Sequence, residues 1–427
     1  MNTICNVRIF DGTAFRQETS VSFDGEVITA LDNRNTGADM DGLLLCPGFV
    51  DIHMHGHLGL DSMRPGENAK MAATQVQYGV TAFCPASVTQ TDGPIRAYLA
   101  DIRAAMALER GARVLGAYLE GPYLAEPVRG AHDADKLRDP ELSHYQALTA
   151  GYEDEVVRVT LAPERKGGME LVSYLKSRGV TVSIGHSAAT AEECARSIEL
   201  GVNSSTHTCN GMEPLHHRKP GVLGVTLTQD AIRAEFIADL IHIDPILIRL
   251  IHRAKGPQGC YYCTDSLEAA GMPDGVYNLG GSDVTVHNGI AKKGDSLAGS
   301  TLTMDQGLRN LVQKVGLPLA DALGMGTRIP AQVIGRTDLG RIAPGCKADF
   351  ILLDRESAGT GHLRPGNLRI PGDIASFSAA HPPQSSPEGR TAFPPGHFLF
   401  PRRLPAPAMP AEPTGKSFLF RILYAIL

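Results

Sequence analysis

From about Leu43 onward, short apolar runs alternate with longer amphipathic ones, and this alternation constrains the fold more than any other feature of the chain. Apolar runs of strand length between helical segments are typical of parallel sheets whose strands are joined by helices. About eight such units in roughly 290 residues match the size of a (β/α)₈ barrel. We therefore expect an α/β fold with a TIM-like barrel over residues 48–335, and a doubly wound sheet is the alternative.

Seven segments of this region have strand character, and two helices have recognisable ends. The helix expected at Met169–Arg178 stops at Gly179, and Thr190 with Glu193 forms a capping box for a helix that ends before Gly201. The expected strands are Gly48–His55, Val114–Glu120, Val156–Leu161, Val180–His186, Asn203–His207, Arg233–Ile237 and Tyr261–Asp265.

The segments on either side of the expected barrel differ from it in pattern. Residues 1–47 contain short strands with Asp-Gly turns, and a matching piece runs from Leu339 to Asp354. We expect residues 1–47 and 336–354 to form one small β-sandwich domain from both chain ends. Residues 355–427 hold 12 of the 28 prolines, which predicts an irregular tail because proline removes backbone donors.

Composition excludes several classes of partner and location. The net charge of −6 and the lack of a long Lys/Arg run give no reason to expect nucleic acid. The chain has no apolar stretch long enough to span a bilayer and no secretory signal at its start, so we expect no membrane association. The 8 scattered cysteines suit a reducing compartment, and we expect the cytoplasm.

The segment Pro47-Gly-Phe-Val-Asp-Ile-His-Met-His-Gly carries the strongest chemical signal. Successive side chains of a strand point to opposite faces, so His53 and His55 lie on the same side near its C-terminal end. Two imidazoles placed in this way can share a metal ion. Taken alone, the pair could equally be inward-facing polar residues of the core.

Four further metal-ligand side chains each end an expected strand: Glu120, His186, His207 and Asp265. The C-terminal ends of barrel strands converge, so these side chains should meet His53 and His55. Imidazole nitrogen and carboxylate oxygen suit Zn²⁺ or Fe²⁺, and an open coordination position allows the ion to activate water. The six residues therefore predict a hydrolytic metal centre.

The order and spacing of several motifs resemble the N-acetylglucosamine-6-phosphate deacetylase family of the amidohydrolase superfamily, over residues 1 to about 354. That resemblance implies a (β/α)₈ barrel with a small β-sandwich built from both chain ends, usually as a homodimer. The motifs are the His53/His55 segment, Leu119-Glu-Gly-Pro, Gly185-His-Ser, Thr206-His-Thr-Cys-Asn-Gly-Met, Thr264-Asp and Leu297-Ala-Gly-Ser.

The resemblance also implies roles for the ligand-type residues. Glu120, His186 and His207 would hold the principal divalent metal, zinc or iron, and Asp265 would be the catalytic acid/base. His53 and His55 are present in this sequence, so we expect that each subunit can bind a second ion. Water on the metal would attack the acetyl carbonyl, Asp265 would take its proton and pass one to the departing amine, and His132 would polarise the carbonyl.

Substrate recognition rests on the same resemblance, which implies hydrolysis of N-acetylglucosamine 6-phosphate to glucosamine 6-phosphate and acetate. Asn210 and Gly211 would line the sugar-phosphate pocket, His242 would contact the ligand, and Arg218 would reach a phosphate across the dimer interface. From the residues alone, without the resemblance, we would expect residues 216–219 to be a solvated loop and His132 to be a surface loop residue.

Three alternatives to this substrate and reaction stay open at this point. A deacetylase for N-acetylgalactosamine 6-phosphate, or another amidohydrolase, would use the same metal chemistry. A barrel protein that binds a ligand without turnover is the alternative from another functional class, although such a protein would usually lack some of the metal ligands.

Residues 355–427 are the one departure from the family, whose members continue with further strands after the position of Asp354.

Overall fold

The protein is described by a computed structural model that covers residues 2–108 and 110–353. The proline-rich segment 355–427 lies outside the described residues, so the prediction of an irregular tail stays a prediction. Within the described part of the chain, no helix is long and apolar enough to cross a bilayer.

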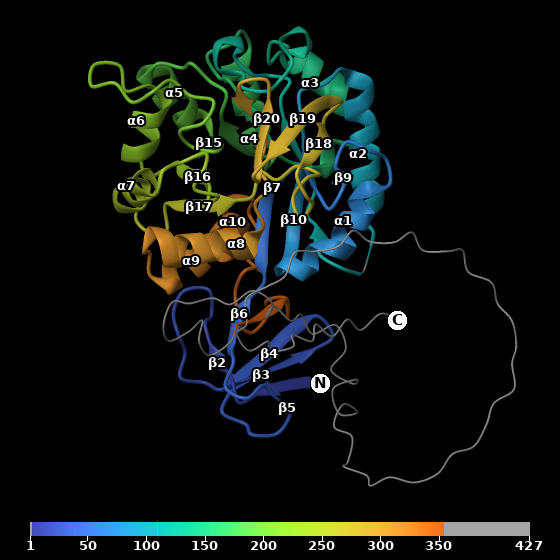
Figure 1. The fold of residues 1–427 in the computed structure, drawn as a ribbon, viewed down its shortest axis with the longest axis vertical. Helices are drawn as coiled ribbons and strands as arrows, with labels where there is room; N and C mark the ends of the chain where they lie inside the picture. The colour runs from blue at the N-terminus through green and yellow to red at the C-terminus, as the bar shows by residue number, and fades with distance from the viewer. Residues whose placement is uncertain (1, 109, 354–427) are drawn as a thin grey trace, which may run out of the picture. The chain divides into compact units, whose positions relative to one another are not determined.

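Eight parallel strands form the barrel that the sequence predicts, and helices surround them (Figure 1). Neighbouring strands pair in chain order, and the ends of β17 and β7 meet where the Asp265 N–H donates to the His53 carbonyl at 2.9 Å. The eight are β7 (Phe49–Met54), β10 (Val80–Ser87), β12 (Ala117–Glu120), β13 (Val156–Leu161), β14 (Thr181–Ile184), β15 (Val202–Ser205), β16 (Arg233–Ile237) and β17 (Cys260–Cys263). The doubly wound alternative is therefore wrong.

One barrel strand, β10, is not among the strands expected from the sequence. It contains Pro85, which lacks a backbone donor and normally argues against a central strand. The register of β10 against β7 shifts between Phe83 and Pro85, and this irregularity accommodates the proline. The short strand β11 (Arg113–Val114) pairs with the other side of β10.

The helices pack their apolar faces on the strands, and the two with predicted ends are confirmed. Helix α4 ends next to Gly179, and the Thr190 side chain accepts from the Glu193 N–H in a complete capping box at the start of α5. The helices are α1 (Glu67–Gln75), α2 (Asp92–Met106), α3 (Leu142–Thr149), α4 (Gly168–Ser177), α5 (Ala191–Leu200), α6 (Gly221–Thr228), α7 (Pro245–Lys255), α8 (Met304–Arg309), α9 (Leu319–Gly326) and α10 (Arg328–Val333).

Two small sheets contain the first strands of the chain, and one of them also contains the last described strand. One consists of β1 (Asn2–Cys5), β3 (Ser20–Asp24), β4 (Val27–Asp32) and β5 (Ala38–Asp39). In the other, β6 (Leu44–Pro47) pairs parallel with β2 (Arg8–Ile9) and antiparallel with β22 (Phe350–Leu353). The small β region from both ends of the fold is thus present, whereas its boundaries as a separate domain stay a prediction.

An antiparallel sheet that the sequence did not predict lies between β17 and α8 in the chain. It consists of β18 (Gly275–Leu279), β19 (Ser282–His287), β20 (Ile290–Lys293) and β21 (Ser296–Leu297), paired in that order. Its strands begin close after Asp265, so the sheet stands over the C-terminal ends of the barrel strands (Figure 1). A second short pair, β8 (Gly56–His57) with β9 (Leu60–Asp61), follows the His53/His55 strand.

Candidate active site

The six predicted ligand residues meet at the C-terminal ends of the barrel strands, where all six side chains are buried. Three of them lie two residues beyond the last residue of their strand, with left-handed backbones: His186 (φ 47°), His207 (φ 27°) and Asp265 (φ 48°). Non-glycine residues in this region each cost about 1–3 kcal/mol and gather at functional sites, where surrounding structure enforces them. The strand ends thus aim these side chains at one point.

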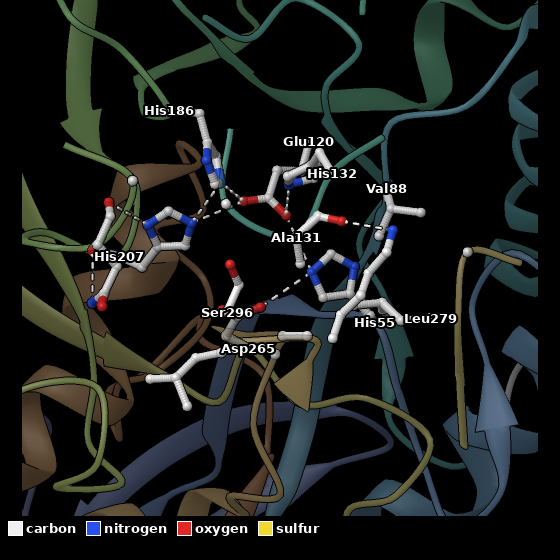
Figure 2. Close-up of a pocket in the computed structure, with 18 of the residues that line it drawn as sticks. His55, Val88, Glu120, Ala131, His132, His186, His207, Asp265, Leu279 and Ser296 are labelled. Carbon is white, nitrogen blue, oxygen red and sulfur yellow. Dashed lines mark hydrogen bonds and ion pairs between the residues drawn. The ribbon is translucent and has the colours of Figure 1, made fainter. Parts of the chain in front are cut away.

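Glu120, His186 and His207 form the first group of converging atoms (Figure 2). The Oε1 atom of Glu120 lies 3.4 Å from His186 Nε2 and 3.1 Å from His207 Nε2. The two Nε2 atoms are themselves 3.0 Å apart. Three ligand atoms at these separations match the edges of a coordination shell whose metal-ligand distances are about 2.0–2.2 Å.

The other ring nitrogens determine which atoms of these histidines carry protons. His186 Nδ1 lies 2.9 Å from the Val128 carbonyl, and His207 Nδ1 lies 3.1 Å from the Asn210 carbonyl. A carbonyl oxygen only accepts, so both Nδ1 atoms donate, and the Nε2 atoms that face Glu120 are the ones that can bind a metal ion. Two imidazole nitrogens and a carboxylate oxygen at these separations form a donor set that fits a divalent metal.

A second group adjoins the first through the other oxygen of Glu120. Glu120 Oε2 lies 3.4 Å from His53 Nε2 and 3.2 Å from His55 Nε2. Asp265 Oδ1 lies 3.3 Å and 3.1 Å from the same two nitrogens. Glu120 therefore faces two clusters of ligand atoms, one with each oxygen.

The charges of the two groups hold each other in their ionised forms. Burial alone would raise the pKa of Glu120 and of Asp265, but the imidazoles around them lower both below their ordinary values. Burial disfavours the charged form of His55, yet Asp265 and Glu120 raise its pKa to about 9. The two carboxylates are thus ionised, and an ionised carboxylate can bind a cation.

His132 lies beside these groups, against the ring of His186 with 4.7 Å between the ring centroids (Figure 2). Its Nδ1 accepts from the Thr89 N–H at 3.3 Å, so the proton of the neutral ring is on Nε2. Burial, with the neighbouring His186, lowers the pKa of His132 to about 3. His132 is therefore a neutral N–H donor, and its Nε2 lies 3.9 Å from Glu120 Oε2.

A cavity of about 320 Å³ opens above the two groups of ligand atoms. It is lined by loops of the barrel and by the β18–β21 sheet. Figure 2 shows Leu279 and Ser296 of that sheet beside His55 and Asp265. From the same sheet, Lys293 Nζ donates to the Ala131 carbonyl at 3.0 Å and to Asp133 Oδ1 at 2.5 Å. Lys293 thereby fixes the residues on either side of His132.

Residues 44–382 of the chain match the sequence model described as the Amidohydrolase family. The chain belongs to the amidohydrolase family. It is 36% identical over 346 residues to the N-acetylgalactosamine-6-phosphate deacetylase of Escherichia coli O157:H7, covering 79% of this chain and 89% of that protein. It is 35% identical over 333 residues to the N-acetylglucosamine-6-phosphate deacetylase of Lysinibacillus sphaericus, covering 77% and 86%.

A solved structure supports the same relationship. It is a variant of the N-acetyl-D-glucosamine-6-phosphate deacetylase of Mycobacterium smegmatis in complex with N-acetyl-D-glucosamine-6-phosphate. This amidohydrolase matches it with a TM-score of 0.78 and 29% identity, covering 83% of this chain and 95% of that one.

The predicted substrate-binding residues divide into two sets in this amidohydrolase. Asn210, Gly211 and His242 line the cavity, as does His132. His242 Nδ1 donates to Asp239 Oδ2 at 2.7 Å. Burial lowers the pKa of His242, but the bond to Asp239 outweighs this effect and raises it. Arg218 is exposed and does not line the cavity of its own chain.

Two cysteines and one further histidine of the barrel have surroundings other than the cavity. Cys260 and Cys263 are buried in β17, where they pack in the core. His57 is buried with its Nε2 2.8 Å from the Thr74 hydroxyl, and burial lowers its pKa to about 4. It does not line the cavity.

The sequence did not single out Glu235, Arg158 or Lys293. Glu235 and Arg158 are completely buried within β16 and β13; Glu235 contacts His53, and the two residues contact each other. A signal was present, because each is a charged residue between two apolar neighbours in a strand, as in Val157-Arg-Val and Ala234-Glu-Phe. Such residues are almost never fully buried unless paired.

Proposed function

We propose that this amidohydrolase is a deacetylase that hydrolyses N-acetyl-D-glucosamine 6-phosphate to D-glucosamine 6-phosphate and acetate. The convergence of His186 Nε2, His207 Nε2 and Glu120 Oε1 carries this proposal, because it creates a cation site at the floor of a cavity. The relatives named for amino-sugar phosphate deacetylation supply the substrate class.

The chemistry divides among the metal, Asp265 and His132. A divalent ion held by Glu120, His186 and His207 would supply Lewis acidity and lower the pKa of a coordinated water toward neutrality. Asp265 accepts a proton as the water oxygen attacks the acetyl carbon, and it then gives a proton to the amine nitrogen as the C–N bond breaks. The Nε2–H of His132 donates to the carbonyl oxygen, on which negative charge develops.

Zinc is the ion that we propose first, with iron as the alternative, because nitrogen and carboxylate ligands suit both. The second cluster, formed by His53, His55, Asp265 and the remaining oxygen of Glu120, supports a second ion per subunit. In that arrangement, Glu120 would help to hold both ions.

Phosphate recognition combines residues of one cavity with a residue of a second subunit. We propose that Asn210, Gly211 and His242 contact the sugar phosphate within the cavity. Arg218 would act on the cavity of a partner in a homodimer, since it is exposed on its own chain. Leu215, three residues before Arg218, is a large apolar side chain with 54% exposure, which supports an interface on this side.

A cytoplasmic location is part of the proposal. All eight cysteines of the chain are free, and seven of them are buried. Free thiols are the usual state of cysteine in a reducing compartment.

The galactosamine epimer is the second candidate substrate, favoured by the relative from Escherichia coli O157:H7. Acetate release should be measured on both N-acetylhexosamine 6-phosphates at steady state. We expect the higher kcat/KM for the glucosamine epimer, whereas equal or reversed values would overturn the assignment.

Asp265→Asn should abolish acetate release, and unchanged release would contradict the proposed role of Asp265.

A further inference from the structure

Glu235 is a carboxylate beneath the ligand atoms, on β16, with no exposed surface. Its Oε1 lies 2.9 Å from His53 Nδ1 and accepts the backbone N–H of His207 at 3.1 Å. One carboxylate oxygen therefore contacts a ligand residue of each cluster, although Glu235 itself faces neither cavity nor solvent.

Arg158 is the partner of Glu235 and is equally buried, on β13. Its Nη1 donates to Glu235 Oε2 at 2.5 Å and to the Ile52 carbonyl at 3.2 Å, and its Nε donates to the Ser183 hydroxyl at 3.0 Å. Its guanidinium lies 4.3 Å over the ring of Tyr118. Arg158 thus fixes Glu235 in position and balances its charge.

A fully buried ion pair is not explained by stability alone. Desolvation of two charges costs several kcal/mol per ion, and apolar residues of similar volume are often as stabilising or more so. The pair is, however, placed where it orients His53. Both oxygens of Glu235 already accept hydrogen bonds, Oε2 from Arg158 Nη1 and Oε1 from the His207 N–H, so Glu235 is the acceptor toward His53 as well.

His53 therefore donates from Nδ1, and Nε2 is the ring atom that faces Glu120 Oε2 and Asp265 Oδ1. The other two histidines discussed above are oriented by neutral carbonyls, of Val128 and Asn210. A carboxylate on the far nitrogen of a ligand histidine fixes its tautomer and raises its basicity, and losing it typically weakens metal binding 10–100-fold.

We propose that Glu235, held by Arg158, is a positioning residue that fixes His53 with Nε2 toward the second cation site. This inference deepens the proposed function, since it concerns the same metal centre. It predicts that Glu235 contributes to metal affinity although it is not a ligand.

The test is zinc affinity, measured as stepwise dissociation constants by competition with a chromophoric chelator. Glu235→Asp keeps the charge and the partner Arg158 but withdraws the carboxylate from His53. The double variant R158M/E235L removes both charges with similar volume and guards against failure through an unpaired buried charge. Glu155→Gln, at the far end of the same barrel and paired with Arg103, is the control.

We expect at least one stepwise dissociation constant to rise about 10–100-fold in a folded Glu235 variant, with Glu155→Gln unchanged. If every stepwise dissociation constant of both Glu235 variants equals the wild-type value, the proposal is wrong. The readout is independent of the reaction. A wild type that binds zinc in a Glu235-dependent way, yet releases no acetate from either sugar phosphate, would refute the proposed function and leave this inference standing.

Discussion

A side chain on Gly211 has no room beside His186: an ideal Cβ there would lie 2.6 Å from His186 Nδ1 and 3.0 Å from its Cε1. Gly211 also has a left-handed backbone, with φ of 58°. Gly211, which the family resemblance assigns to the sugar-phosphate pocket, therefore also sets the position of the ligand histidine His186.

Gly211→Ala should displace the ring of His186 and weaken metal binding by about 10-fold or more. Zinc content after dialysis and acetate release check this result. Gly179→Ala is the matched control, because Gly179 has φ of 76° but no atom within 4 Å of its ideal Cβ. Both variants should lose about 1–2 kcal/mol of stability through backbone strain, and equal zinc content in the two would contradict the contact with His186.

His132→Gln should lower kcat by about 10²–10³-fold with a smaller effect on KM, because the donor acts on charge that develops in the transition state. Steady-state kinetics on N-acetylglucosamine 6-phosphate measures both constants. His144→Gln is the control, since His144 lies beside Tyr123 and Asp92 and does not line the cavity. An unchanged kcat in His132→Gln would contradict its assignment to the carbonyl oxygen.

Lys293→Met should release the segment around His132, since Lys293 joins the Ala131 carbonyl to Asp133. We expect kcat to fall about 10-fold or more through misplacement of the His132 donor. Lys292→Met removes the neighbouring, exposed lysine and should leave kcat unchanged. If both variants keep wild-type kinetics, the β18–β21 sheet does not position His132.

Arg218 acts in the partner's cavity if the proposed dimer is correct. Arg218→Ala should raise KM for the sugar phosphate, and Asp265→Asn should lack activity. Mixed and allowed to exchange subunits, the two variants should form dimers with one intact site and recover low-KM activity. Activity of the mixture equal to the sum of the separate variants would show that Arg218 and Asp265 do not combine across subunits.

Much of the centre could be predicted because metal ligands follow local rules. Strand alternation puts His53 and His55 on one face, and Glu120, His186, His207 and Asp265 each end a strand, where a parallel barrel brings them together. The predicted substrate residues Asn210 and His242 reach the cavity as well.

What the sequence did not predict depends on contacts between distant segments. Glu235 and His53 are 182 positions apart, and Lys293 and Ala131 are 162 apart. No local pattern links such pairs. Strand β10 was missed because Pro85 conflicts with strand rules, and the β18–β21 sheet because its short strands are separated by closely spaced glycine turns such as Gly280-Gly281.

The central claim is that acetate release by this chain depends on a metal held by these residues. Protein stripped with a chelator, and found free of transition metal by elemental analysis, should release no acetate from N-acetylglucosamine 6-phosphate. Added Zn²⁺ or Fe²⁺ should restore release in proportion to the metal bound. Undiminished acetate release by the metal-free protein would contradict the account.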